Sequence, residues 1–322
     1  MSYFLFKRVL TLLATLLATS VIVFAVLEVL PGNAAQVLMG PDADPAAVAA
    51  KAAELGLDRP ALERYLDWMA GLLRGDMGQS YAYGSPVAAL IGERLLLTVP
   101  LALLAMALTT VIALAVGVYA AARHRTAGDA GLMTLAQIGI AIPNFWFAIL
   151  LILLFSVKLQ WLSAGGFDGW YFDDGVWRGL WDGLQALILP AIALAVVQAA
   201  ILARFTRSAV LEVLREDFVR SARAKGLSHR ATLWGHVLRN AMIPVITVMG
   251  LQFAELLAGT IVVENVFYLP GLGRLIFQSI ANRDVIVVRN CVMLLAAMVV
   301  LVNFVVDVLY AVIDPRVKAA EI

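Results

Sequence analysis

The sequence predicts an all-α integral membrane protein with six transmembrane helices. Hydrophobic residues make up 62% of the 322 residues, and the mean hydropathy is +0.89, whereas soluble globular domains are roughly 45–50% apolar. Apolar runs recur along the chain at about the 20-residue length that a helix needs to cross the hydrocarbon core of a bilayer. Lys and Arg gather in some of the short segments between these runs, as they do in multi-pass membrane proteins.

The first apolar run, Val9 to Leu30, follows Lys7 and Arg8. It is longer than the core of a secretory signal peptide and lacks a small-x-small cleavage site, so we expect it to remain as the first spanning helix. Pro143 lies within the third run, where a proline removes a backbone hydrogen bond and allows a bend. The six predicted spans are 9–30, 97–122, 134–157, 185–205, 240–262 and 290–312.

The distribution of basic residues predicts the orientation in the membrane. The segments 1–8, 123–133, 204–239 and 313–322 carry 14 of the 24 Lys and Arg, although they are short. The longer segments on the other side carry the remainder together with many acidic residues. Because basic loops stay in the cytoplasm, we predict that both termini are cytoplasmic.

The first external segment, 31–98, is too long for a simple turn. It contains two stretches with apolar residues at helical spacing, Ala46 to Leu57 and Pro60 to Leu73. These two short helices either pack on the outer membrane surface or form a platform over a translocation path, and both interpretations remain open here. The predicted organisation is a first helix (1–30), an external segment with short helices (31–98), a five-helix membrane core (97–312) with a cytoplasmic loop (206–239), and a tail (313–322).

The sequence lacks the patterns that indicate an enzyme. It has no GxxxxGK[ST] phosphate-binding loop and no HExxH zinc motif. The three histidines, His124, His229 and His236, fall in predicted cytoplasmic segments and show no pattern of zinc ligands. The single cysteine, Cys291, lies in an apolar run and is expected to be a buried free thiol. We therefore expect no catalytic residue, no metal site and no cofactor in this chain.

Few acidic residues fall inside the predicted spans, namely Glu28, Glu255 and Asp307. A charge at the centre of a bilayer costs on the order of 3 kcal/mol or more, so such a group usually faces a cavity or the interior of a bundle. Glu255 is predicted either to line a pathway or to pair with a partner subunit. Gln252 and Asn144 are further candidates for the pathway, although amides within spans more often make hydrogen bonds between helices.

Two connections between spans carry strong local signals. In the basic stretch from Glu216 to Pro244, Gly226 predicts the end of a short helix and Ser228 predicts the N-cap of the next one. The connection before the last span reads LPGLGR from Leu269 onwards, an apolar sequence with turn residues. Such a sequence at the membrane surface indicates a turn packed within protein and not exposed to lipid.

The segment DFVRSARAKGL, which starts at Asp217, resembles the coupling-loop motif of the permeases of binding-protein-dependent ABC importers. It is most similar to the dipeptide/oligopeptide/nickel branch. The general motif begins with Glu-Ala-Ala six residues before its glycine, where this chain has Arg220-Ser221-Ala222, and the proline that usually follows closely appears only at Pro244. The peptide branch is similar in both respects. The resemblance covers essentially the whole chain, with further matching segments at 30–34 (Asn33 standing where Asp is typical), 142–146, 269–274, 302–304 and 314–316.

The resemblance implies a non-catalytic subunit of the type I ABC importer permease fold in the bacterial cytoplasmic (inner) membrane. A second homologous permease would complete a pathway for di- or oligopeptides or similar small polar solutes. Two cytoplasmic ATP-binding subunits would bind ATP and magnesium. A periplasmic or lipid-anchored binding protein would deliver the substrate, and no nucleic acid is expected. The residues assigned to the outer gate or the binding-protein side are Pro270, Gly271, Gly273 and Arg274.

The resemblance also assigns contact with the ATPase subunits to one set of residues. They are Arg220, Ser221, Ala222, Arg223, Lys225, Gly226 and Leu227. The glycine would end the helix sharply, the two small residues would permit close docking, and the basic side chains would meet acidic groups or helix C-termini of the ATPase. Without the resemblance, the same basic loop is equally explained by its role in setting membrane topology.

Two other classes of protein provide alternatives. A secondary transporter driven by an ion gradient predicts internal repeats and proton or sodium ligands within the membrane, and the sequence shows neither clearly. An integral membrane enzyme needs a catalytic constellation, which the sequence lacks. Similar permeases carry peptides, nickel chelates, glutathione and opines, so the predicted substrate class stays broad.

Overall fold

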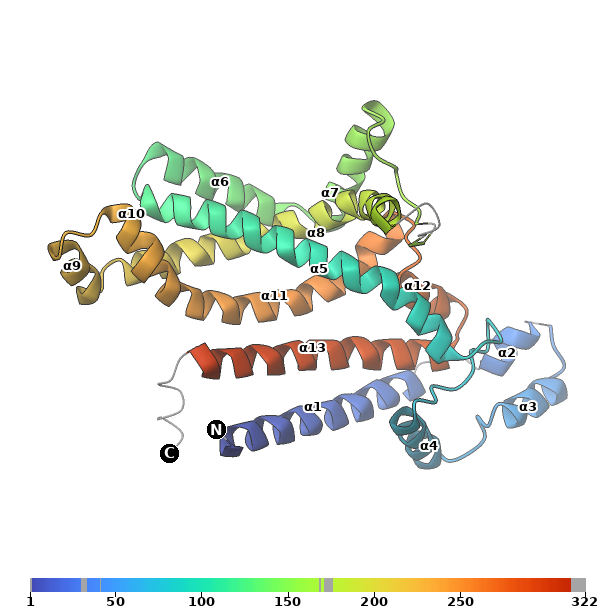
Figure 1. The fold of residues 1–322 in the computed structure, drawn as a ribbon. Helices are drawn as coiled ribbons and strands as arrows, with labels where there is room; N and C mark the ends of the chain where they lie inside the picture. The colour runs from blue at the N-terminus through green and yellow to red at the C-terminus, as the bar shows by residue number, and fades with distance from the viewer. Residues whose placement is uncertain (1, 30–33, 41, 168, 171–175, 314–322) are drawn as a thin grey trace. The chain divides into compact units, whose positions relative to one another are not determined.

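The computed structural model describes residues 2–29, 34–40, 42–167, 169–170 and 176–313. Within these ranges the regular elements are helices, which confirms the predicted all-α fold (Figure 1). Residues 30–33, which belong to the family-like segment 30–34, lie outside the described residues, as does the predicted tail from 314 onwards. The α-helices are α1 (Ser2–Val29), α2 (Ala34–Met39), α3 (Pro45–Glu54), α4 (Ala61–Arg74), α5 (Val87–Ala122), α6 (Ala127–Ala141), α7 (Asn144–Leu151), α8 (Val176–Val213), α9 (Asp217–Ala224), α10 (His229–Thr232), α11 (Leu238–Val266), α12 (Leu272–Ala281) and α13 (Val285–Ile313).

Five helices in the described part of the chain are long and apolar enough to cross a membrane. They cover Leu5–Val29, Val87–Ala122, Val176–Val213, His229–Val266 and Val285–Val308. A sixth span is obtained if α6 and α7, with the π-helical turn Ile152–Lys158 that continues α7, are counted as one broken element. The six predicted spans are thus matched by five long helices and this broken pair, and most of the helices are longer than the hydropathy alone suggested.

The third span differs from the single, bent helix predicted over 134–157. Its two halves meet at a bend of 101°. Ile142 has an extended backbone (φ −86°, ψ 123°), and Pro143 precedes the first residue of α7. A proline disfavours the helical conformation of the residue before it and donates no backbone hydrogen bond. The bend expected at Pro143 is therefore present, but it interrupts the helix completely.

The chain forms two compact units, each described here by itself. The first consists mainly of Pro100–Leu269, and the second of Arg8–Val99 with Pro270–Leu301. The helices α3 and α4 thus share a unit with most of α1 and with the first part of α13. The two external helices predicted from apolar spacing are present as α3 and α4, and α2 precedes them.

The first unit is built around α8, which packs against α6, α7 and α11. Close approach of α5 to α8 depends on Gly117. A Cβ atom at this position would lie 2.7 Å from the carbonyl oxygen of Ala203 and 2.7 Å from Cβ of Thr206. Small side chains allow helix backbones to approach each other in membrane proteins. The buried cluster around this contact includes Ala113, Val118, Ala121, Leu202, Ala203, Val210, Val237, Ala241 and Val245.

The second unit joins α1, α4 and α13 through aromatic packing and hydrogen bonds. Phe24 of α1 stacks on Trp68 of α4, with ring centroids 6.2 Å apart. The Trp68 indole donates to Oδ1 of Asn290 at 2.9 Å, and the Asn290 amide donates to the carbonyl of Met77 at 2.9 Å. Cys291, one residue further along α13, is a free buried cysteine, as predicted.

The contact at Gly117 gives a prediction about stability. In Gly117→Ala the new methyl group meets backbone of α8 that has little freedom to move. Overpacking of this kind costs roughly 1–3 kcal/mol, which exceeds the gain of up to about 1 kcal/mol in helix propensity. We expect a lower thermal unfolding midpoint for the purified variant in detergent.

Gly131→Ala provides the matched control, because no atom lies within 4 Å of a Cβ built at this position on α6. This variant should keep or slightly raise the unfolding midpoint. Equal midpoints for the two variants would contradict the close contact between α5 and α8.

Candidate functional site

The connection between α8 and α11 (residues 214–237) lies at one end of the first unit and contains α9 and α10 (Figure 1). Its local structure follows from two residues. Gly226 ends α9 with φ +91°, a left-handed conformation that glycine adopts without steric cost. Ser228 then caps α10, its hydroxyl accepting a hydrogen bond from the Ala231 amide at 3.2 Å. The helix stop and the helix cap predicted from the sequence are both confirmed.

One face of α9 packs against the protein and the other is exposed. Val219 is buried and belongs to the same apolar cluster as Leu233 and Val237. Ala222 is also buried, so its side chain faces inward. The remaining residues that the sequence assigned to ATPase contact are exposed, namely Arg220, Ser221, Arg223, Lys225, Gly226 and Leu227. The role of the whole set stays a prediction, but α9 presents most of it outward from an anchored helix.

The outer face of α9 keeps its charges available. Arg220 makes an ion pair with Asp217 at 3.4 Å, but the side chains are 78% and 94% exposed. Exposed ion pairs of this kind contribute little to stability and are easily exchanged for other partners. This face of α9 is therefore a basic, solvated surface beside two apolar side chains, Phe218 and Leu227.

An ion pair between a half-buried arginine and a buried aspartate holds α8 to α6 before this connection begins. Nε of Arg207 lies 2.6 Å from Oδ1 of Asp129, and Nη2 of Arg207 lies 2.7 Å from Oδ2. The Asp129 carboxylate also accepts from the Arg125 amide at 3.0 Å, and the His124 ring lies 3.3 Å away. Bidentate pairs of this type are strong and fix the relative orientation of the two groups.

No motif in the sequence predicts this ion pair. Asp129 lies in the first turn of α6 behind the N-cap Thr126, which is a common place for an acidic residue. Arg207 follows 78 residues later. The only sequence signal was an arginine near the end of a predicted span, and that is equally explained by membrane topology.

The three pathway candidates lie in the first unit, but in different environments. Gln252 is buried and donates to the backbone carbonyl of Gln198 at 3.0 Å, so it joins α11 to α8. Gln198 in turn donates to Oε2 of Glu255 at 3.2 Å. Asn144 is half-buried, and its amide nitrogen lies 3.7 Å from a Cβ atom built on Gly259, one turn beyond Glu255.

Glu255 is the exposed member of this group. It lies within an apolar helix long enough to span the membrane. A carboxylate facing lipid at that depth would be unfavourable by several kcal/mol. The exposed face of α11 at Glu255 is therefore expected to meet water or another protein, whereas Gln252 serves as a contact between helices.

A second buried carboxylate, Glu264, is not among the residues predicted from the sequence. Its side chain is fully buried near the end of α11. The signal was present, because Glu264 interrupts the apolar stretch IVVENV. It was not recognised because it falls just outside the predicted span.

The predicted outer-gate residues lie in the second unit at the start of α12. Gly271 and Gly273 are buried, while Pro270 and Arg274 are half-buried. The amide of Leu272 donates to Oγ1 of Thr98 at 2.8 Å, and Arg94 donates to the carbonyl of Pro270 at 3.2 Å. The expectation that this turn packs within protein is confirmed.

No group of three His, Cys, Asp or Glu side chains in the described part of the chain is arranged to hold a metal ion. His229 and His236 are both exposed on the connection between α8 and α11.

Comparisons with known proteins agree with this arrangement. The model of the family described as "Binding-protein-dependent transport system inner membrane component" matches residues 113–319, and the model for the N-terminal part of such membrane components matches residues 1–102. The di/tripeptide transport system permease protein DppB of Pseudomonas aeruginosa is 39% identical over 98% of both chains. The glutathione transport system permease protein GsiC of Salmonella choleraesuis is 42% identical over 98% of both chains.

A solved structure shows a related fold. It is the crystal structure of an amino acid ABC transporter with histidines, and it matches with a TM-score of 0.50 at 16% identity, covering 71% of this chain and 94% of that chain. At this level of identity the match concerns the fold alone.

Fold, site and relatives define a membrane transport permease, a subunit that forms a path and has no catalytic function of its own. The chain belongs to the family of binding-protein-dependent transport system inner membrane components. It is thus a multi-pass membrane protein that works with ATPase and substrate-binding partners. The family resemblance noted from the coupling-loop sequence is confirmed.

The exposed carboxylate on α11 gives a second prediction. Glu255→Gln keeps the hydrogen-bonding shape of the side chain and removes its charge. If Glu255 lines the path, the uptake rate or the preference among substrates should change severalfold, while the amount of assembled complex stays the same. Uptake by reconstituted vesicles and yield of the purified complex measure the two quantities.

Glu63→Gln is the control, because Glu63, in the first turn of α4, forms an exposed surface ion pair with Arg59. Its uptake should equal that of the wild type. Loss of assembly in Glu255→Gln, with normal uptake per assembled complex, would instead show that Glu255 binds a partner subunit.

Proposed function

We propose that this chain forms half of the transmembrane pathway of an ATP-driven importer of short peptides or similarly sized polar solutes. A second, homologous permease subunit completes the pathway. Two ATP-binding subunits on the cytoplasmic side bind ATP and magnesium and contact the exposed face of α9. A binding protein, periplasmic or anchored to lipid, delivers the substrate on the outer side, and both termini of the chain are cytoplasmic.

The observation that carries this proposal is the construction of α9. The helix is anchored on one face by Val219 and ends sharply at Gly226. It is continuous in the chain with α8 on one side and α11 on the other. A displacement of α9 is therefore passed directly to the two helices that carry Gln198 and Glu255.

The exposed face of α9 suits an acidic partner. Arg220, Arg223 and Lys225 are exposed, and none of them is committed to a buried ion pair among the described residues. Charged groups of this kind steer association and select the partner more than they add to raw affinity. Phe218 and Leu227 supply apolar contact area beside them.

The proposed substrate class rests on the relatives and on Glu255. The names of the two relatives refer to di- and tripeptides and to glutathione, respectively, all of which are short peptides. An exposed carboxylate on a spanning helix fits the ammonium group that a free peptide carries.

Charge reversal on α9 tests the proposal. In Arg220→Glu/Arg223→Glu, an acidic ATPase surface would be repelled, so ATP-dependent uptake should fall by at least about tenfold. Stimulation of ATP hydrolysis by the binding protein should be lost to a similar extent. Both are measured in vesicles containing the reconstituted complex.

Arg74→Glu changes charge in the same direction at an exposed position at the end of α4, and it should leave uptake unchanged. Wild-type uptake in the double α9 variant, with the protein inserted in the membrane, would contradict the proposed coupling role. Uptake that persists without ATP and stops when ion gradients are collapsed would contradict the proposed function itself.

A further inference from the structure

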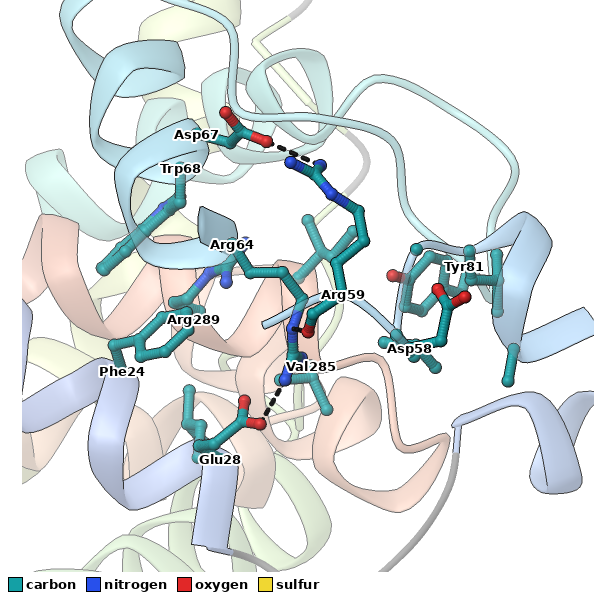
Figure 2. Close-up of a pocket in the computed structure, with 16 residues that line it drawn as sticks. Phe24, Glu28, Asp58, Arg59, Arg64, Asp67, Trp68, Tyr81, Val285 and Arg289 are labelled. Carbon is teal, nitrogen blue, oxygen red and sulfur yellow. Dashed lines mark hydrogen bonds and ion pairs between the residues drawn. The ribbon is translucent and has the colours of Figure 1, made fainter. Parts of the chain in front are cut away.

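The second unit contains a cavity of about 650 Å³ (Figure 2). Its walls come from the end of α1, the segment between α3 and α4, the first half of α4, and the first turns of α13. This volume lies in the range of pockets that hold small molecules. Apolar side chains form much of the lining, including Leu27, Leu55, Leu57, Val285 and Ile286.

The charged side chains of this cavity are balanced, with three cations and three anions. Two cations are already neutralised by neighbours in the lining. Arg64 is paired with Glu28, and Arg59 is paired with Asp67 at 2.7 Å, as the dashed lines in Figure 2 show. One cation and one anion remain, Arg289 and Asp58.

Arg289 is held in place by aromatic rings, and no ion pair with it is found among the described residues. Its guanidinium carbon lies 4.6 Å from the centroid of the Trp68 ring and 5.6 Å from that of Phe24. No acceptor among the described residues forms a hydrogen bond with its Nε atom. The hydrogen bond from the Trp68 indole to Asn290 fixes the position of one of these two rings. A guanidinium fixed in this way presents a planar set of donors that matches a carboxylate.

Asp58 supplies the opposite charge. It is exposed in the segment between α3 and α4, and the structure gives its carboxylate no hydrogen bond or ion pair within the described ranges. Figure 2 shows Arg289 and Asp58 on opposite sides of the pocket. Burial raises the pKa of the neighbouring lining residue Tyr81 above its usual value, so Tyr81 is a neutral hydroxyl at pH 7.

We propose that this cavity binds a short peptide in its zwitterionic form, with the C-terminal carboxylate on Arg289 and the α-ammonium group facing Asp58. The choice of a peptide rests on the proposed function, whereas the requirement for opposite charges rests on the cavity alone. The site lies in a different unit from Glu255, so it is a separate contact for the solute in this subunit. Apolar walls between the two charges accommodate varied side chains.

The size and charge of the cavity favour a small zwitterion over an acidic side chain of a docked protein. An acidic side chain would use Arg289 but would leave Asp58 without a partner. It would also fill only part of the volume. Docking of the binding protein through this cavity is therefore the competing outcome that the experiment must detect.

The test measures equilibrium binding of radiolabelled trialanine to the assembled complex in lipid nanodiscs, without the binding protein. Trialaninamide and N-acetyltrialanine serve as competitors that lack one charge each. Trialanine should bind about tenfold or more tightly than either analogue, because each analogue loses a charged hydrogen-bonding partner. Arg289→Gln should weaken trialanine binding by a similar factor and remove the discrimination against the amide.

Asp58→Asn should act in the complementary way. It should weaken trialanine binding and remove the discrimination against the N-acetyl analogue, while the amide remains a poor ligand. Arg289→Lys retains the charge but loses the planar fork, so it should fall between the wild type and Arg289→Gln. Lys51→Gln, at an exposed pair with Glu54 on α3 outside the lining, should bind trialanine as the wild type does.

Three results would overturn the proposal. One is the absence of trialanine binding to the wild-type complex, and another is equal binding of all three peptides. The third is a loss of affinity for the binding protein in Arg289→Gln with trialanine binding unchanged, which would assign the cavity to protein docking. Failure of the proposed function is recognised separately, as the absence of ATP-dependent uptake of any peptide by the wild type.

Discussion

Polar groups within membrane-spanning helices are stabilised by partners inside the protein, and in the described part of the first unit α8 provides several of them. Gln198 of α8 contacts both Glu255 and Gln252 of α11. Nearer the C-terminal end of α8, Arg207 is paired with Asp129 of α6. The bidentate geometry of this pair fixes the relative orientation of the two side chains. The orientation of α8 relative to α6 and α11 is thus fixed by specific polar contacts as well as by small-residue packing.

This constraint gives the α8–α11 connection its mechanical importance. The connection starts a few residues after Arg207 and returns the chain to α11. Because α9 packs on the same apolar cluster as the ends of α8 and α11, a force on α9 acts on helices whose relative orientation is defined. A flexible loop at this place would absorb the same force without moving Glu255.

Local chemistry could be predicted from the sequence wherever neighbouring residues decide the conformation. Gly226 and Ser228 are examples, since the left-handed glycine and the serine N-cap each depend on a few adjacent positions. The position of the break at Pro143 could be predicted in the same way. The bend angle of 101° could not be predicted, because packing around α7 determines how far the two halves diverge.

Contacts between residues far apart in the chain could not be predicted from the sequence. Asp129 and Arg207 are separated by 78 residues, and neither has a neighbour that identifies the other. Ala222 looked like a small residue suited to close docking, but helical phase alone did not show that it faces inward with Val219. The cavity at Arg289 combines four chain segments, so its charge balance becomes visible only in the folded unit.

Site-directed cross-linking can establish whether the exposed face of α9 contacts an ATPase subunit. The only cysteine, Cys291, is buried, so a single new thiol at Ser221 can be addressed selectively with a short bifunctional reagent in the assembled complex. We expect Ser221→Cys to form a covalent product with an ATPase subunit, in a yield that changes when ATP is added. If no such product forms in a complex that retains ATP-dependent uptake, α9 does not contact the ATPase through this face.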